Sequence, residues 1–207
     1  HYVENNRPLK DGDLILVDAG AEYKGYAADI TRTFPINGRF SQAQREVYDV
    51  VLDVQQNCTD FTKTGNTVKK RQELSVELLT EGMKKLGLLK GKTSDLIKKK
   101  AYMKYYMHGV GHYLGLDVHD AGRYFTDQAA KSSRPFAPGM VLTVEPGLYI
   151  PPDDRSAPPK YRGIGVRIED DVLVTEEGNR NLTAKVPKDP DEIEAIMNSG
   201  KSRAAAK

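Results

Sequence analysis

The chain has 207 residues and a mass of 23.0 kDa, a length typical of one domain or two small ones. Lys and Arg number 31 and Asp and Glu number 29, so the net charge of +2 offers no electrostatic case for binding nucleic acid or a membrane. No run approaches the ~18 apolar residues of a membrane-spanning helix. A single cysteine, Cys58, excludes an internal disulfide and predicts a cytoplasmic protein.

Two extended segments are predicted near the start of the chain. Leu14–Val17 follows an Asp-Gly turn, and this short apolar run predicts a buried strand. Residues 26–34 predict a second strand, which Pro35 and an Asn-Gly pair close. From residue 102 to residue 183 the pattern again indicates strands and loops.

Helical periodicity dominates the segment between these strand regions. Ser41 with Gln44 three residues later is typical of a capping box and predicts a helix over residues 42–60. The spacing of apolar residues predicts a second helix over residues 67–86 and a shorter one over residues 94–100.

Basic residues cluster on these predicted helices, at Lys69–Arg71 and Lys98–Lys100. Because the net charge is close to zero, we interpret both clusters as solvated helix surface rather than as a phosphate-binding face. At the end of the chain, one or two helical turns are expected over residues 190–197. Residues 198–207 are expected to form a disordered tail.

An internal repeat relates two distant parts of the chain. Residues 11–20 align without gaps with residues 138–147, at an offset of 127 residues. Both segments read as turn, glycine, apolar strand, carboxylate, small residue and glycine. Tyr23-Lys24-Gly25 likewise matches Tyr161-Arg162-Gly163. The repeat predicts two related strand pairs in a pseudo-twofold arrangement.

Each strand pair brings two carboxylates. Asp18 and Asp29 belong to the first pair, and Glu145 and Glu169 belong to the second. Asp18 and Glu145 directly follow apolar runs, and a carboxylate that is taken out of water needs a compensating charge. Few basic residues lie near these acids in the sequence, so a divalent metal ion is the expected compensating charge.

Three of the four histidines lie within twelve residues, at His108, His112 and His119. The first two have the spacing of a zincin helix, but Gly109 stands where a Glu is required, and two glycines would cost a helix ~2 kcal/mol. We therefore expect strand and loop here, with the histidines at a site. Carboxylates combined with imidazole favour Mn, Co or Fe, and four carboxylates suit two ions ~3.5–4 Å apart.

Five segments together resemble the pita-bread metallopeptidases, which include methionine aminopeptidases, prolidases and, most similar here, the aminopeptidase P family. The segments are Val17–Gly20, Tyr26–Pro35, His108–Asp120, Leu142–Tyr149 and Tyr161–Asp171. The resemblance implies an α+β fold of the creatinase/aminopeptidase type. Such a fold is a pseudo-twofold repeat of antiparallel strands with helices on the outer face.

The resemblance also implies a site. The family's metal ligands fall on Asp18, Asp29, His112, Glu145 and Glu169, and its supporting positions fall on His1, His108, His119 and Arg167. It implies two divalent metal ions, Mn²⁺ foremost with Co²⁺, Fe²⁺ and Zn²⁺ as alternatives, and a metal-bridging hydroxide that attacks the scissile carbonyl. Glu145 would accept the proton of that nucleophile, His108 and His119 would hold the substrate and stabilise the oxyanion, and Arg167 would orient the metal carboxylates.

The activity implied is hydrolysis of the bond between an N-terminal residue and a following proline in a peptide. Two alternatives stay open, a prolidase acting on Xaa-Pro dipeptides and a non-catalytic pita-bread module that binds a peptide or protein. Residues 161–171 and 179–183 favour aminopeptidase P over prolidase. A creatine-hydrolysing relative is disfavoured because that branch lacks these metal ligands.

The family's catalytic domain has further helices and a strand before the position of His1, and aminopeptidase P has a separate N-terminal domain as well. We therefore expect residues 1–197 to form a catalytic domain that lacks its N-terminal helices and strand. A second polypeptide is expected to carry the missing part, within an oligomer. Without that part, the first strand pair is expected to expose an apolar face.

Overall fold

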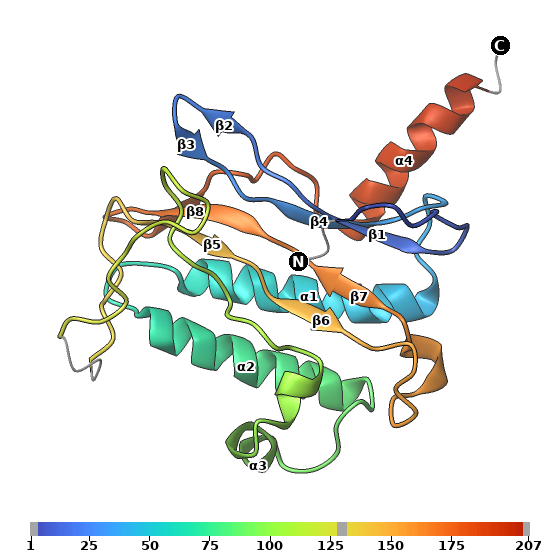
Figure 1. Ribbon diagram of the computed structural model, residues 1–207, viewed down its shortest axis with the longest axis horizontal. Coiled ribbons are helices and arrows are strands. Elements are labelled where there is room, and N and C mark those ends of the chain that lie inside the picture. The colour runs from blue at the N-terminus through green and yellow to red at the C-terminus, as the bar shows by residue number, and fades with distance from the viewer. Residues whose placement is uncertain (1–3, 128–131, 205–207) are drawn as a thin grey trace.

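The computed structural model describes residues 4–127 and 132–204 of the chain (Figure 1). The helices are α1 (Gln42–Phe61), α2 (Val68–Lys85), α3 (Thr93–Lys98) and α4 (Pro190–Ala204), with short 3₁₀ turns at Ala101–Lys104 and Pro159–Tyr161. The strands are β1 (Leu14–Asp18), β2 (Glu22–Tyr23), β3 (Tyr26–Ala27), β4 (Thr31–Pro35), β5 (Val141–Val144), β6 (Gly147–Tyr149), β7 (Gly165–Arg167), β8 (Asp170–Val174) and β9 (Asn179–Asn181).

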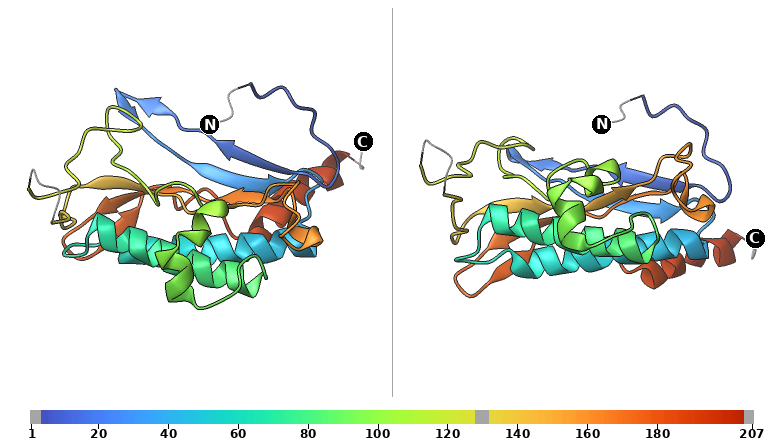
Figure 2. Two further views of the ribbon diagram at one scale, coloured as in Figure 1. Left: turned by 60° about the horizontal axis from the view of Figure 1, so that its bottom comes forward. Right: turned by 90° about the horizontal axis from the view of Figure 1, so that it is seen from below.

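Helices α1 and α2 lie side by side on one face of the strands of the second repeat (Figures 1 and 2). Those strands pair in the order β5-β8-β9 and β6-β7, and β1-β4 lies on the side away from the two helices. Both repeats therefore contribute an antiparallel strand pair, as the internal repeat predicts.

The starts of the two long helices follow from local sequence. At the start of α1, the Ser41 side chain accepts from the Gln44 amide (3.3 Å) while the Gln44 side chain accepts from the Ser41 amide (2.8 Å). Thr67 precedes α2, and its side chain accepts from the Lys70 amide. The hydrogen bonds at both helix starts satisfy amide groups that have no partner inside a helix. Both predicted helices are confirmed.

The predicted strand over residues 26–34 is divided into β3 and β4, with Asp29 in the irregular segment between them. Gly20 permits the close approach of the two segments here, because a Cβ at this position would collide with the Ala28 carbonyl group. The Ala28 amide donates to the Ala21 carbonyl (3.0 Å), and the chain then resumes pairing as β4. The interruption brings Asp29 to the end of β1.

Strand β1 is present, but the prediction that its apolar run is buried is wrong. Leu14, Ile15 and Leu16 are half-buried and Val17 is 39% exposed. Hydrogen bonding joins β1 to β4 on one side. Leu142 and Val144 of β5, by contrast, have no exposed surface, and Val144 belongs to the main hydrophobic core with α1. A short apolar run predicts a strand, but its burial depends on what packs over it.

Arg71 corrects the interpretation of the first basic cluster as solvated surface. Lys69 and Lys70 are exposed, whereas Arg71 is fully buried because it shares the inner face of α2 with Ser75 and Leu79, four and eight residues later. Its Nη1 donates to the Thr62 hydroxyl (3.1 Å), and its guanidinium lies 5.3 Å from the centre of the Phe136 ring.

Helix α4 is longer than the one or two turns predicted, since it continues from Pro190 to Ala204. Asp189 accepts hydrogen bonds from the amides of Asp191 and Glu192 (2.9 and 3.0 Å), which stabilises the start of the helix. Residues 205–207, at the end of the expected tail, lie outside the described residues. None of the described helices has the length and apolarity that crossing a membrane requires.

A buried ion pair joins the two repeats. Arg32 of β4 donates to the Asp170 carboxylate of β8 (2.7 Å) and to the Glu169 carbonyl (2.5 Å). The Glu169 amide donates in turn to the Thr31 carbonyl (3.0 Å). Arg32 and Lys188 beside Asp170 hold the pKa of this carboxyl well below its usual value against the effect of burial. The acids of both repeats are therefore held at one junction.

Candidate metal centre

The four repeated acids lie at the ends of paired strands. Asp18 ends β1 and Glu145 follows β5, while Asp29 and Glu169 lie just before β4 and β8. In an antiparallel pair the end of one strand adjoins the start of the next, and the register pairs Asp18 with Thr31 and Val144 with Asp170. The pairing therefore brings each acid next to its partner.

His112 joins this group from the segment that runs beside β5. The ligand atoms of Asp29, His112 and Glu169 all lie within 4.8 Å of one another. His112 Nε2 is 3.5 Å from Asp29 Oδ2 and 3.4 Å from Glu145 Oε1. Asp18 lies close enough to Asp29 for each carboxylate to change the pKa of the other. The structure thus brings together all five residues assigned as metal ligands.

The backbone sets the orientation of the His112 ring. His112 Nδ1 lies 2.9 Å from the Tyr113 carbonyl, and an N–H donated there leaves the lone pair of Nε2 facing the carboxylates. The His112 amide donates to the Thr143 hydroxyl (3.1 Å), and the Thr143 amide donates to the His112 carbonyl (2.9 Å). Residues 108–112 form a loop beside β5, and an isolated bridge pairs Tyr113 with Leu142, so the expectation of strand and loop in place of a helix is confirmed.

Burial and mutual repulsion make these acids difficult to ionise together. Burial, followed by the neighbouring carboxylates, raises the pKa of Glu169 to about 9. Burial also raises the pKa of Glu145 to about 7, and burial with the nearby Asp29 raises that of Asp18. The pKa of Asp29 stays below its usual value, because hydrogen bonds to His112 and Asp18 outweigh the effect of its burial.

This donor set fits divalent metal. Hard carboxylate oxygens combined with one imidazole nitrogen suit Mn²⁺, Co²⁺, Fe²⁺ or Zn²⁺. A metal ion would also provide the positive charge that allows all of these acids to be ionised together. Among the described residues, Arg167 is the one Lys or Arg side chain that forms an ion pair with a carboxylate assigned as a metal ligand.

Arg167 links both repeats through its three donor groups. Its Nη2 donates to Asp18 Oδ2 (2.6 Å), its Nε to the Thr31 hydroxyl (3.1 Å) and its Nη1 to the Tyr149 hydroxyl (3.0 Å). Thr31 in turn donates to Glu169 Oε2 (2.6 Å). Arg167 therefore orients one acid directly and another through Thr31.

The other histidines occupy different places around the cluster. His108 Nε2 lies 2.8 Å from the Tyr149 hydroxyl, and its Nδ1 is 3.9 Å from Glu145 Oε2. Burial lowers the pKa of His108. His119 is exposed, with its ring centre 4.1 Å from that of His112. His1 lies outside the described residues.

Sequence reasoning missed the residues that connect these side chains. Thr31 and Tyr149 both lie within the motifs that carry the resemblance, yet neither was assigned a role. The available signal was their position, since Thr31 follows Asp29 by two residues and Tyr149 follows Glu145 by four. Asp171 was also unassigned, and its Oδ2 accepts from the Asp29 amide (3.2 Å).

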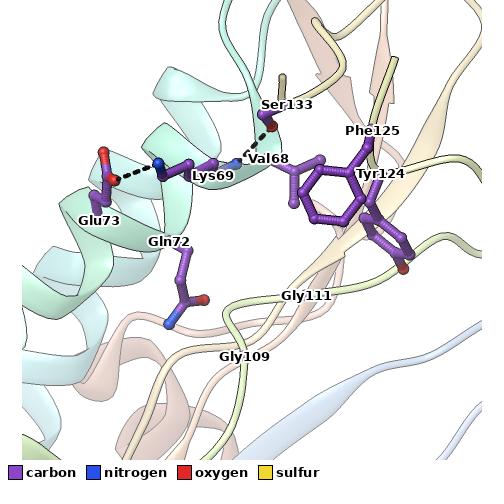
Figure 3. A pocket seen from close by; sticks show the side chains of 9 residues that line it. All are labelled: Val68, Lys69, Gln72, Glu73, Gly109, Gly111, Tyr124, Phe125 and Ser133. Atoms are coloured by element: carbon purple, nitrogen blue, oxygen red, sulfur yellow. Dashed lines mark hydrogen bonds and ion pairs between the residues drawn. The ribbon is translucent and has the colours of Figure 1, made fainter. Parts of the chain in front are cut away.

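Two cavities lie close to this centre. One, of about 660 Å³, lies between the first turns of α2 and residues 124–125, with Gly109 and Gly111 at its side (Figure 3). Val68, Phe125 and Tyr124 face it (Figure 3), and none of the assigned metal ligands lines it. The other cavity, of about 610 Å³, is lined by Asp171 and by Ala28 and Tyr113, the sequence neighbours of Asp29 and His112, and none of the assigned metal ligands lines it.

A mixed α/β chain with a carboxylate-rich candidate metal centre between two repeated strand pairs is typical of the pita-bread class of metal-dependent enzymes. Residues 1–176 match the model of metallopeptidase family M24, and the chain belongs to this family. It is 54% identical over 197 residues to the Xaa-Pro aminopeptidase of Escherichia coli, a match that covers 95% of this chain and 44% of that protein.

Two solved structures agree with the fold. Aminopeptidase PepP of Pseudomonas aeruginosa matches with a TM-score of 0.94 and 50% identity, over 98% of this chain and 45% of that one. A zinc-substituted aminopeptidase P of E. coli, in complex with product, matches with a TM-score of 0.89 and 54% identity, over 96% of this chain and 44% of that one. The chain therefore spans about half the length of the relatives it matches. The predicted pita-bread fold is confirmed.

Proposed function

We propose that this chain carries the catalytic metal centre of an Xaa-Pro aminopeptidase, which hydrolyses the bond between an N-terminal residue and a following proline. The observation that supports this most directly is the convergence of Asp29, His112, Glu145 and Glu169, with Asp18 beside them. The E. coli relative named Xaa-Pro aminopeptidase is 54% identical, which favours the same chemistry.

The proposed cofactor is a pair of divalent metal ions, Mn²⁺ in preference to Co²⁺, Fe²⁺ or Zn²⁺. Asp18, Asp29, His112, Glu145 and Glu169 would hold them, as hard oxygen donors with one imidazole. When bound, divalent metal lowers the pKa of water and polarises the scissile carbonyl group.

Glu145 is suited to accept and return a proton. Without metal, burial raises the pKa of its carboxyl group to about 7. Oε1 of Glu145 faces His112 while Oε2 faces His108. In this proposal Glu145 takes the proton of the attacking water and later delivers it to the departing proline nitrogen.

His108 and His119 are proposed to bind the peptide. His108 Nδ1 lies 2.8 Å from the Gly109 carbonyl, and an N–H donated there leaves Nε2 to accept from the Tyr149 hydroxyl. Arg167 donates in turn to the same hydroxyl. This chain of contacts holds the His108 ring beside Glu145. His119 is exposed next to His112, where its ring can contact a substrate carbonyl. We propose the same role for His1.

Two assays test this proposal. The Mn²⁺-loaded chain is offered an Xaa-Pro-Pro tripeptide and the matching Xaa-Pro dipeptide. Release of the first residue from the tripeptide alone supports an aminopeptidase, whereas cleavage of the dipeptide alone indicates a prolidase. Elemental analysis distinguishes the third alternative, because a non-catalytic binding module need not retain stoichiometric metal.

We also propose that a second polypeptide covers the outer side of β1 within an oligomer. Val17 is 39% exposed and its neighbours in β1 are half-buried, which leaves apolar surface uncovered. The relatives that the chain matches are about twice its length. A chain that alone sediments as a monomer, melts cooperatively and binds no hydrophobic dye would contradict this proposal.

A further inference from the structure

The small net charge of the chain conceals an uneven distribution of lysine. Residues 85–100 contain six of the 31 basic residues and one of the 29 acids, so this segment has a net charge of +5. The rest of the chain, with 25 basic and 28 acidic residues, has a net charge of −3. We call the six lysines of this segment the lysine surface: Lys85, Lys90, Lys92, Lys98, Lys99 and Lys100. A local positive field therefore exists on a chain that is nearly neutral as a whole.

The charges of the lysine surface are exposed and have no acidic partner. All six side chains are exposed, and the lysine ion pairs among the described residues involve none of them. The lysines on either side differ, since Lys84 pairs with Glu81 and Lys104 pairs with Asp154. Because like charges repel one another, six unpaired lysines in one region oppose folding rather than support it. The packing of the chain thus gives no reason for their presence.

The backbone that carries the lysine surface is fixed in place. Leu86 and Leu88 are buried, and Ile97 of α3 packs against the main hydrophobic core. Lys84 Nζ donates to the Thr93 hydroxyl (2.7 Å), which ties the end of α2 to the start of α3. Helix α3 lies beyond α2 at the edge of the molecule (Figure 1). The lysines therefore project from an ordered outer surface.

The composition of this segment indicates the chemistry of a partner. Residues 85–100 contain no arginine, the side chain that pairs with carboxylates through two parallel hydrogen bonds. They contain no aromatic ring on which an unpaired base could stack. None of the exposed large apolar side chains lies in this segment, so nothing is available to insert into a bilayer. Point charges on flexible stems suit a dense array of phosphate groups, and a nucleic acid duplex provides one phosphate per ~1.7 Å of its axis.

We propose that the lysine surface binds the phosphate backbone of double-stranded nucleic acid without regard to base sequence. Each ammonium group that neutralises a phosphate releases counterions, so the affinity depends steeply on salt concentration. This binding is separate from the proposed peptidase function, because no residue of the lysine surface is assigned to the metal ions or to the substrate.

The first test measures the fluorescence anisotropy of a labelled DNA duplex of about 20 base pairs as the Mn²⁺-loaded chain is added. A Kd of about 10⁻⁴–10⁻⁶ M is expected at physiological salt, with tighter binding at lower salt. A plot of log affinity against log NaCl concentration should have a slope of about −3 to −5, which corresponds to roughly three to six phosphate contacts. Duplexes of different sequence should bind equally.

The second test compares two double variants that remove equal charge. Lys98→Gln with Lys99→Gln should weaken binding and make the salt slope shallower by about 2. Lys69→Gln with Lys70→Gln is the matched control, because these two exposed lysines lie in the first turn of α2, at the other end of that helix. The control should keep the slope of the wild-type chain. Melting temperatures of both variants should match that of wild type, since substitutions of exposed side chains seldom change stability.

Three results would overturn the inference. The first is no change in anisotropy at ~50 mM NaCl, where contacts with phosphate are strong. The second is an equal loss of affinity in both double variants, which would make binding a property of overall charge. The third is tighter binding to phosphatidylserine-containing vesicles or to polyglutamate than to the duplex at the same salt concentration, which would assign the surface to a membrane or to an acidic protein.

Discussion

The two repeated strand pairs have the same pattern but differ in what covers them. Val17 and Val144 are equivalent residues, 127 positions apart, and each immediately precedes an acid. Val144 is completely buried, with α1 packed against β5, whereas Val17 is 39% exposed. The repeat therefore predicts where each strand ends and that an acid follows it. The burial of each strand, by contrast, depends on elements that the repeat does not include.

The acids show the same difference. Glu169, from the second pair, is 1% exposed and its pKa is raised to about 9, first by burial. Asp18, from the first pair, is exposed and contacts Arg167. The proposed metal centre consequently has a buried side, where the acids lack positive charge, and an open side that solvent can reach.

The largest effect is expected from Glu145→Gln. The substitution removes the proton acceptor of the buried side and keeps a side chain of nearly the same shape, so kcat on an Xaa-Pro-Pro peptide should fall ~10²-fold or more. Metal content, measured by elemental analysis, should stay close to that of wild type. A variant with nearly normal kcat would show that Glu145 is not the proton acceptor.

His119→Ala is the companion variant for this prediction. It should lose activity and keep its metal, because His119 is assigned to substrate and His112 to metal. If His119→Ala emptied the site instead, the assignment of these two histidines would be reversed.

Metal removal should make stability strongly dependent on pH. In the metal-free chain the folded-state pKa values of Glu145 and Glu169, about 7 and about 9, exceed the usual value of 4.5. The folded state then holds protons that the unfolded state releases, so stability should fall as pH rises from about 4.5 to 9. Metal at 100 times its Kd should restore about 2.7 kcal/mol.

Melting temperatures at pH 5, 7 and 9, with chelator and with Mn²⁺, check this prediction. Glu169→Gln should flatten the pH dependence of the chelated chain, whereas Asp18→Asn on the exposed side should change it less. A chelated chain equally stable at pH 5 and pH 9 would contradict the proposed repulsion among the acids.

The equivalent valines provide a direct test of the difference in burial. Val144→Ala removes buried methyl groups and should lower the free energy of unfolding by about 1.5–2 kcal/mol or more. Val17→Ala, at the same place in the other repeat, should change it by less than about 0.5 kcal/mol. Urea unfolding of both Mn²⁺-loaded variants measures these values. Equal losses would mean that β1 is covered in solution.

Local signals predicted much of the fold and most of the candidate site. The Ser41–Gln44 capping box and the helical periodicity after it were sufficient for α1, and the repeat was sufficient for Asp18, Asp29, Glu145 and Glu169. These features depend on neighbours in sequence or on an exact offset. The exposure of Val17 and the contacts of Thr31 depend on residues more than 100 positions away, and no local pattern contains them.

Arg71 is the clearest case, and it provides the smallest predicted effect. Burial lowers the pKa of its guanidinium to about 10, and its Nε and Nη2 have no hydrogen-bond partner among the described residues. Arg71→Met keeps an apolar chain of similar length and removes an uncompensated buried charge, so stability should be unchanged or higher by up to ~1 kcal/mol.

Arg32→Met is the matched contrast. Arg32 is also buried, but it pairs with Asp170, and its loss should destabilise the chain by leaving that acid short of a partner. Urea unfolding of both variants with Mn²⁺ decides the point. An Arg71→Met variant as unstable as Arg32→Met would show that Arg71 has a further buried partner in solution besides the Thr62 hydroxyl.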